Sequence, residues 1–291
     1  MTATTRARLE LIGAAVLFST GGAAIKWADF TGWQIASFRS GIAALVLLLL
    51  TPSARRGWSW RATLVGVAYA GCLILFVLAN RLTTAANTIF LQSTAPLYIL
   101  LLAPWLLKEP IRRHDLGFMF AVGLGLLLFF VGTEQPETTA PDPARGNLLA
   151  LASGFCWALA ICGFRWLSAA PGRGSPLAAV VSGNLTAFLI TLPMALPVGR
   201  HPVGDWAVIV YLGVFQIALA YVFVTAAIRV LPALESSVFL LIEPVLNPLW
   251  AWVIQRETPG AWALLGGAII LGATTLKGWT EGRGRVAAPV T

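Results

Sequence analysis

Residues 81–109 read RLTTAANTIFLQSTAPLYILLLAPWLLKE, and residues 229–257 read RVLPALESSVFLLIEPVLNPLWAWVIQRE. The two stretches align without a gap when the second is shifted back by 148 residues. Each has an apolar run with a central proline, and about 13 residues later each has a basic residue followed by a glutamate. This order of features predicts an internal duplication. The matched positions are Arg81 with Arg229, Ala85 with Ala233, Pro96 with Pro244, Leu106 with Ile254, Lys108 with Arg256, and Glu109 with Glu257.

The alignment continues into a glycine-containing helix in each half once one further residue is inserted. Glycines let two helices approach closely, and packing within the chain is the favoured interpretation. A homodimer face is the alternative, so the chain is expected to be a monomer or a homodimer. These glycines are Gly117, Gly123 and Gly125 in the first half, and Gly266, Gly267 and Gly272 in the second.

The amino-acid composition indicates the environment in which this chain folds. Of its 291 residues, 58% are hydrophobic and only 11% are charged, whereas an ordinary soluble domain is about 25% charged. So few charges cannot form the polar shell of a soluble enzyme or a nucleic-acid-binding domain. The formal net charge of +8 is therefore attributed to membrane topology, and no nucleic-acid partner is expected. The expected surroundings are a lipid bilayer.

Apolar runs of about 20 residues predict membrane-spanning helices, because a helix rises 1.5 Å per residue across a core of about 30 Å. The expected fold is an all-α polytopic membrane protein with ten transmembrane helices. The short gaps at 82–83 and 230–231 leave open a single kinked helix at each place. The predicted spans are 8–27, 32–51, 61–81, 84–107, 114–133, 146–168, 175–197, 205–229, 232–255 and 260–279.

A proline-rich, acidic stretch divides the spans into two sets of five. The predicted organisation is a first five-helix repeat over 1–133, a non-cytoplasmic linker over 134–145 and a second five-helix repeat over 146–291. Because five is odd, the two copies must enter the membrane from opposite sides, as inverted repeats. Inverted repeats are common in secondary transporters, which bind substrate near the midplane and work by alternating access.

The distribution of basic residues predicts that both termini are cytoplasmic. With ten spans, 14 of the 20 Lys and Arg residues fall at the predicted cytoplasmic ends of the helices and 6 at the opposite ends. Cytoplasmic loops retain such an excess. The six at the opposite ends are Lys26, Arg39, Arg81, Arg145, Arg200 and Arg256.

The ten spans in two halves, Pro96 followed by Lys108-Glu109, and Glu243-Pro244 followed by Arg256-Glu257, resemble the EamA-type drug/metabolite transporter superfamily. The segment Thr88–Tyr98 is similar to the YddG-type aromatic amino-acid exporters. The resemblance covers about Leu9 to Lys277. It implies a bacterial inner-membrane location and efflux of amino acids or related small metabolites. It also implies a central cavity formed by the third, fourth, eighth and ninth spans, assisted by the first and sixth.

Glu243 is the outstanding candidate for a functional residue, because a carboxylate within a span costs roughly 2.5–3.5 kcal/mol on insertion scales. It is expected to recognise a substrate amine or to couple protons. The alternative is a protonated or Arg-paired group that holds helices in place. Pro96 and Pro244 are candidate hinges, with a fixed kink as the alternative. Glu109 and Glu257 are expected in ion pairs or caps at helix ends.

Helical spacing predicts which other side chains face the cavity. Aromatic rings would bury the apolar part of a small-molecule substrate, while amide and hydroxyl groups would hold its polar ends. Core packing is the alternative for any single aromatic residue. With Glu243, the predicted substrate-binding residues are Asn80, Asn87, Thr94, Tyr98, Trp157, Gln216, Tyr221, Phe239 and Asn247.

The function predicted from these features is export of aromatic or neutral amino acids, or related metabolites, by a secondary transporter. Proton-coupled multidrug efflux is the main alternative. An integral membrane enzyme acting on lipids and a membrane scaffold are weaker alternatives. No cofactor or metal is expected, because the two histidines and three cysteines form no ligand pattern. The sequence has no Walker A motif, so direct coupling to ATP hydrolysis is not expected.

Overall fold

The computed structural model describes residues 2–106, 111, 113–131, 135–169, 172–228, 230–231 and 233–286, and every named element among them is a helix. Eight helical stretches in these ranges are long and apolar enough to cross a membrane. The chain is therefore an all-helical, multi-pass membrane protein. The eight stretches are Ala3–Trp27, Gly32–Leu50, Trp60–Leu82, Ala85–Leu102, Pro143–Ser168, Pro176–Ala195, Val203–Ala227 and Ala261–Trp279.

The described residues of the first half form seven α-helices and one short 3-10 helix, η1 (Pro52–Arg55). The seven α-helices are α1 (Ala3–Ser19), α2 (Gly21–Trp27), α3 (Gly32–Leu50), α4 (Trp60–Leu82), α5 (Ala85–Gln92), α6 (Ala95–Leu106) and α7 (Arg113–Val131).

The second half contains a π-helix, η2 (Leu212–Leu219), within the apolar stretch Val203–Ala227. In a π-helix the backbone is wound more widely than in an α-helix. Its α-helices are α8 (Pro143–Ser168), α9 (Pro176–Ala195), α10 (Val203–Tyr211), α11 (Ala220–Ala227), α12 (Ala233–Leu240), α13 (Ile242–Gln255) and α14 (Ala261–Val286).

Two predicted spans are not among the eight long apolar stretches. The predicted span 114–133 corresponds to α7, whose apolar part, Asp115–Val131, is shorter. The predicted span 232–255 is divided into α12 and α13 by a break at Leu241. The total of ten spans and the inverted relation of the two halves therefore stay predictions.

The matched prolines each lie just after a break in a helix. α5 ends at Gln92 and α6 begins at Ala95, so Pro96 is in the first turn of α6. Pro244 is likewise in the first turn of α13. The first backbone N–H groups of a helix have no partner within it, so a proline there removes no helical hydrogen bond. Whether these breaks act as hinges stays a prediction.

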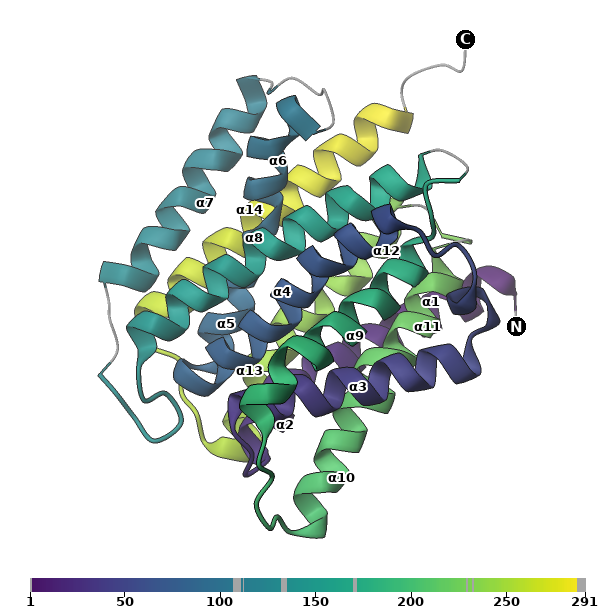
Figure 1. Cartoon of the computed structure of the whole chain (residues 1–291). Coiled ribbons are helices and arrows are strands. Elements are labelled where there is room, and N and C mark those ends of the chain that lie inside the picture. Colours follow the sequence, from purple (N-terminus) through teal and green to yellow (C-terminus); the bar gives the residue numbers. More distant parts are fainter. Residues whose placement is uncertain are drawn as a thin grey trace.

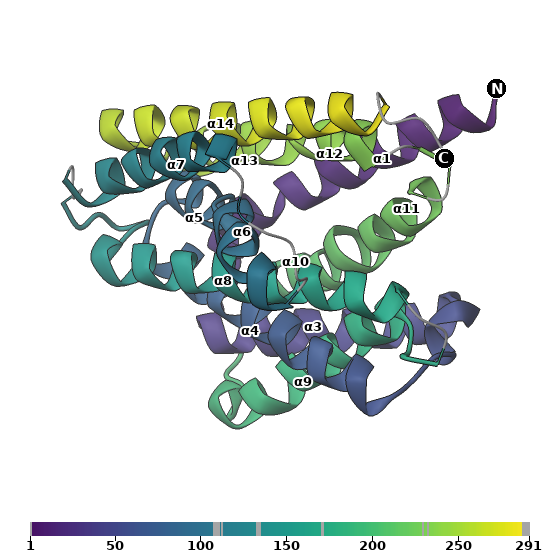
Figure 2. The same cartoon turned by 90° about the horizontal axis from the view of Figure 1, so that it is seen from above.

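Helices from the two halves interleave (Figures 1 and 2). α4 packs against α8 and α9, α3 against α9, α1 against α11, and α7 against α14. Figure 2 shows α7 and α14 along one edge of the molecule and α9 along the opposite edge. The interior is therefore built jointly by residues from before and after the predicted linker.

The contact between α4 and α9 requires glycine. A side-chain carbon at Gly183 of α9 would lie 2.7 Å from the carbonyl oxygen of Gly66 in α4, which is too near for any other residue. Small residues allow this close backbone approach between membrane helices. The α4–α9 contact fixes one wall of the interior.

Candidate functional site

A cavity of about 170 Å³ lies among α1, α3, α4, α5, α8, η2, α11, α12 and α13. About 10–15 Å³ of such space holds one water molecule, so the cavity has room for a small ligand. Its aromatic lining consists of Phe18, Tyr69, Phe76, Trp157 and Tyr221. Its charged and amide lining consists of Arg39, Gln92, Gln216 and Glu243. The rest is Cys72, Leu73, Ile217, Val224 and Leu240.

The aromatic rings form a connected wall around Tyr69. The ring centroid of Tyr69 lies 5.7 Å from that of Tyr221, edge to face, and 6.1 Å from that of Trp157. Phe18 of α1 extends the wall, 5.4 Å from Tyr221 and again edge to face. Such pairs stabilise each other beyond the apolar area that they bury. The wall can therefore hold a flat apolar group in a defined orientation.

Glu243 is partly exposed to this cavity, in the first turn of α13. A helix N-terminus carries a partial positive charge from its unpaired N–H groups, which favours a carboxylate nearby. The break at Leu241 therefore gives Glu243 a favourable place that an unbroken helix would not. No ion pair links it to any described residue.

Gln216 and Gln92 supply the amide groups of the cavity. Gln216 lies within the π-helix η2, and its buried Oε1 atom accepts no hydrogen bond. Short π-helical segments often occur at functional sites. Gln92, by contrast, donates from Nε2 to the hydroxyl of Ser153 at 2.9 Å. Gln216 thus keeps an acceptor free for a ligand, while Gln92 is already engaged.

Contrary to what its position in the sequence predicts, Arg39 does not lie at a helix end. Its place in the sequence predicts a basic residue at the non-cytoplasmic end of a span, but it lies about 10 Å into α3 and is 1% exposed. One of its guanidinium nitrogens, Nη2, donates to the backbone carbonyl of Leu73 at 3.0 Å. The sequence signal was a lone arginine inside an apolar run, and it was missed because the residue is close to the start of the span.

Four of the predicted substrate-binding residues line the cavity: Trp157, Gln216, Tyr221 and Glu243. The other six lie elsewhere. Asn80 donates to the carbonyl of Phe76 within α4, and the Thr94 hydroxyl donates to the carbonyl of Leu91. Tyr98 packs edge to face on Phe155. These contacts resemble ordinary structural roles, and a role in binding stays a prediction for each.

Asn87, Phe239 and Asn247 also lie away from this cavity. Asn87 donates to the Thr83 hydroxyl at 3.2 Å. Phe239 packs against the apolar cluster that contains Leu11. Asn247 is fully buried, and neither its oxygen nor its nitrogen has a hydrogen-bond partner. Helical spacing identified the correct elements here but not which side of each element faces the cavity.

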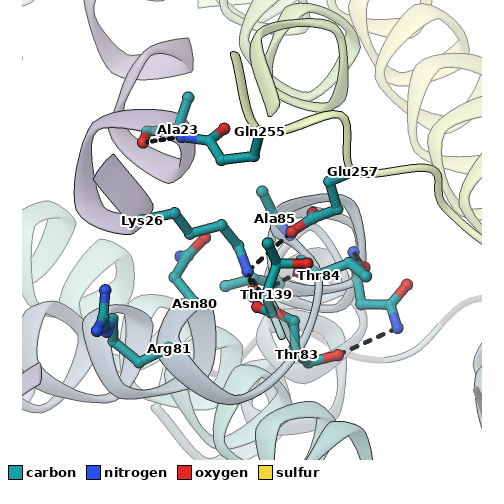
Figure 3. Close-up of polar contacts among 12 residues, drawn as sticks. Ala23, Lys26, Asn80, Arg81, Thr83, Thr84, Ala85, Thr139, Gln255 and Glu257 are labelled. Atoms are coloured by element: carbon teal, nitrogen blue, oxygen red, sulfur yellow. Dashed lines mark hydrogen bonds and ion pairs between the residues drawn. The ribbon is translucent and has the colours of Figure 1, made fainter. Parts of the chain in front are cut away.

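A buried ion pair joins segments from the two halves of the chain (Figure 3). The Lys26 ammonium, at the end of α2, lies 2.8 Å from a carboxylate oxygen of Glu257, and both side chains are at most 4% exposed. Lys26 also donates to the carbonyls of Thr83, at 2.9 Å, and Thr139, at 2.5 Å. The other oxygen of Glu257 accepts the backbone N–H of Ala85, the first residue of α5, at 2.5 Å. Glu257 is thus both an ion-pair partner and a cap of α5.

Neighbouring polar groups add hydrogen bonds around this ion pair. Gln255 donates to the carbonyl of Ala23 at 2.7 Å, and the Thr83 hydroxyl donates to Asn147 at 2.8 Å. Segments at 23–26, 83–85, 139–147 and 255–257 are joined in this way. The sequence predicted an ion pair or cap for Glu257, but Lys26 was not foreseen as its partner, because only the fold brings them together. Lys108 and Glu109 lie outside the described residues.

A larger hollow, of about 410 Å³, is lined by Phe38, Gly41, Ile42, Leu45, Leu48, Leu185, Phe188 and Trp206. It contains no charged side chain, so the first cavity is the better candidate for a specific site. Within the described part of the chain, no cluster of His, Cys, Asp and Glu could hold a metal ion.

Comparison with known families and proteins identifies the chain at the level of its family. Residues 6–131 and 144–277 match the EamA-like transporter family. The chain belongs to this family. It is 23% identical over 262 residues to the uncharacterized transporter YyaM of Bacillus subtilis (strain 168), covering 86% of this chain and 85% of that protein. This EamA-family protein is therefore a transporter of small molecules.

Two further similarities support the family and the fold. The uncharacterized transporter YetK of Bacillus subtilis (strain 168) is 29% identical over 182 residues, covering 60% of this chain and 54% of YetK. A crystal structure superposes with a TM-score of 0.60 and covers 94% of this chain and 97% of its own, at 18% sequence identity. That degree of identity shows a shared fold alone.

Proposed function

We propose that this EamA-family protein is a secondary transporter that exports aromatic or neutral amino acids, or related small metabolites, across the bacterial inner membrane. The observation that carries the proposal is the cavity itself. Side chains from both halves of the chain line it, and it combines an aromatic wall with Arg39, Gln216 and Glu243. Rings suit an apolar side chain, and the charged and amide groups suit the ends of an amino acid.

The proposed mechanism is alternating access, in which the two halves rock around the cavity. One end is closed by buried groups around Lys26 and Glu257. Toward the other end the lining becomes more exposed, from buried Gln216 to partly exposed Val224 on the same run of helix. That end is the one where α1 begins, because Ala7 packs against Ala227. Together with the proposed cytoplasmic termini, this arrangement supports an inward-facing state.

Thiol labelling tests this orientation. In a variant lacking Cys72, Cys156 and Cys162, a cysteine introduced by Val224→Cys is expected to react with a membrane-impermeant maleimide added from the cytoplasmic side. A matched cysteine from Thr84→Cys, at the closed end, is expected to stay unreactive because Thr84 is 3% exposed. Faster reaction of Thr84→Cys than of Val224→Cys would contradict the proposed inward-facing state.

Proton-coupled multidrug efflux is the second candidate function. It is favoured by Glu243, a carboxylate that has no ion-pair partner among the described residues and lies beside aromatic rings. Aromatic rings and a carboxylate would together suit an organic cation. Counterflow of labelled amino acids in proteoliposomes separates the two candidates, because a transporter restricted to organic cations would give no amino-acid flux.

A further inference from the structure

Arg39 is the most deeply buried charged group in the cavity lining. It is 1% exposed, and it reaches the cavity from α3, a helix that the resemblance to known transporters did not place around the site. Nη2 donates to the Leu73 carbonyl, and Nε has no hydrogen-bond partner. A guanidinium has five N–H donors, so one backbone contact leaves most of its capacity unused.

No described carboxylate neutralises this cation. Within the described residues, the ion pairs at 4.0 Å or less do not include Arg39. A buried charge without a partner is costly, and the cost falls sharply when an anion with good geometry binds. A role limited to tying α3 to α4 would need only a neutral donor toward Leu73. The charge therefore requires another explanation.

The same cavity holds acceptors that also lack partners. The buried Oε1 atom of Gln216 accepts no hydrogen bond, and Glu243 has no ion-pair partner among the described residues. These acceptors come from η2 and α13, whereas Arg39 comes from α3. One cavity thus contains a strong cationic donor and two acceptors, each free to meet a ligand.

We propose that Arg39 binds the carboxylate of a zwitterionic substrate, while Gln216 and Glu243 receive its ammonium group. The aromatic wall around Tyr69 takes the apolar side chain between them. A guanidinium is suited to this because its fork can donate two parallel hydrogen bonds to one carboxylate. The inference rests on the proposed function, and it adds a requirement: the substrate must carry a free carboxylate as well as an amine.

Counterflow in proteoliposomes tests the requirement with three probes. Labelled phenylalanine has both charged groups, 3-phenylpropionate has only the carboxylate and 2-phenylethylamine has only the amine. For Arg39→Gln, the half-saturating concentration of phenylalanine is expected to rise about tenfold or more. Inhibition by 3-phenylpropionate is expected to be lost, and inhibition by 2-phenylethylamine to stay as in the wild type.

Arg55→Gln is the matched control. Arg55 also donates to backbone carbonyls, those of Leu48 and Leu49, but it lies outside the cavity. Its replacement is expected to leave the half-saturating concentration of phenylalanine and the inhibition by the other two compounds unchanged. An unchanged half-saturating concentration for phenylalanine in Arg39→Gln would overturn the role of Arg39, and so would an equal weakening of all three probes.

Arg39→Lys covers the case in which Arg39→Gln does not fold. A lysine keeps the charge but loses the fork, so phenylalanine binding is expected to weaken, with 2-phenylethylamine unaffected. Equal effects on both probes would contradict the proposal. The absence of wild-type flux for every amino acid tested would instead contradict the proposed function, which separates the two failures.

Discussion

Two sets of opposite charges lie within the helical bundle, and they are arranged in opposite ways. At the closed end, Lys26 and Glu257 lie 2.8 Å apart, and each makes further hydrogen bonds to backbone groups. In the cavity, Arg39 and Glu243 belong to no ion pair among the described residues. The first set is satisfied within the protein, whereas the second can be satisfied by a ligand.

The difference shows how burial can serve two purposes in one fold. The paired charges join segments from both halves of the chain (Figure 3). The unpaired charges reduce the stability of the empty cavity and favour a ligand that complements them. On this account, loss of a charge at the closed end should damage stability, and loss of a charge in the cavity should damage transport.

The largest expected effect is that of Lys26→Ala. It leaves the Glu257 carboxylate buried without its cation, and such a loss typically costs 3–5 kcal/mol. The free energy of unfolding in detergent is expected to fall by about this amount. A double variant, Lys26→Met with Glu257→Leu, is expected to recover part of it, because well-packed apolar residues can replace a buried pair. If the Lys26→Ala variant were as stable as the wild type, the paired charges would not stabilise the fold, and they would not differ from the cavity charges in this respect.

Glu243→Gln should have a smaller effect on stability and a clear effect on coupling. Since Glu243 has no ion-pair partner among the described residues, the free energy of unfolding is expected to change by only about 1 kcal/mol or less. If Glu243 couples protons, the variant should lose transport driven by a pH gradient while keeping exchange at saturating substrate. Gradient-driven uptake with unchanged pH dependence would reject proton coupling.

Arg8→Gln should have the smallest effect. Arg8 forms an ion pair of 2.6 Å with Glu235 at the proposed open end, but its side chain is 50% exposed. Exposed pairs typically contribute between about 0 and 1 kcal/mol and are weakened by salt. Stability and the half-saturating concentration of substrate are both expected to stay close to wild type. A loss of stability as large as that caused by Lys26→Ala would show that exposure does not determine how much an ion pair contributes to stability.

The sequence predicted the general architecture well because long apolar runs and a matched proline motif are local signals. Hydropathy located the helices, and Pro96 and Pro244 marked the breaks before α6 and α13. Hydropathy did not predict that the span 232–255 is divided, because nothing in it separates the short helices α12 and α13.

The site was predictable only in part. Glu243 and Gln216 were identified because a polar residue within an apolar run is costly and therefore conspicuous. Arg39 carried the same signal, but its position near the start of a span concealed its depth. The pairing of Lys26 with Glu257 depends on segments more than 200 residues apart in the chain, which no local pattern can join.

Counterflow of labelled phenylalanine tests the central claim most directly. Proteoliposomes containing the wild-type protein and preloaded with unlabelled phenylalanine should accumulate the labelled compound transiently above its equilibrium level. Excess unlabelled phenylalanine outside should abolish the signal, because the cavity would be saturated. Labelled aromatic and neutral amino acids that enter no faster than into protein-free liposomes would contradict the account.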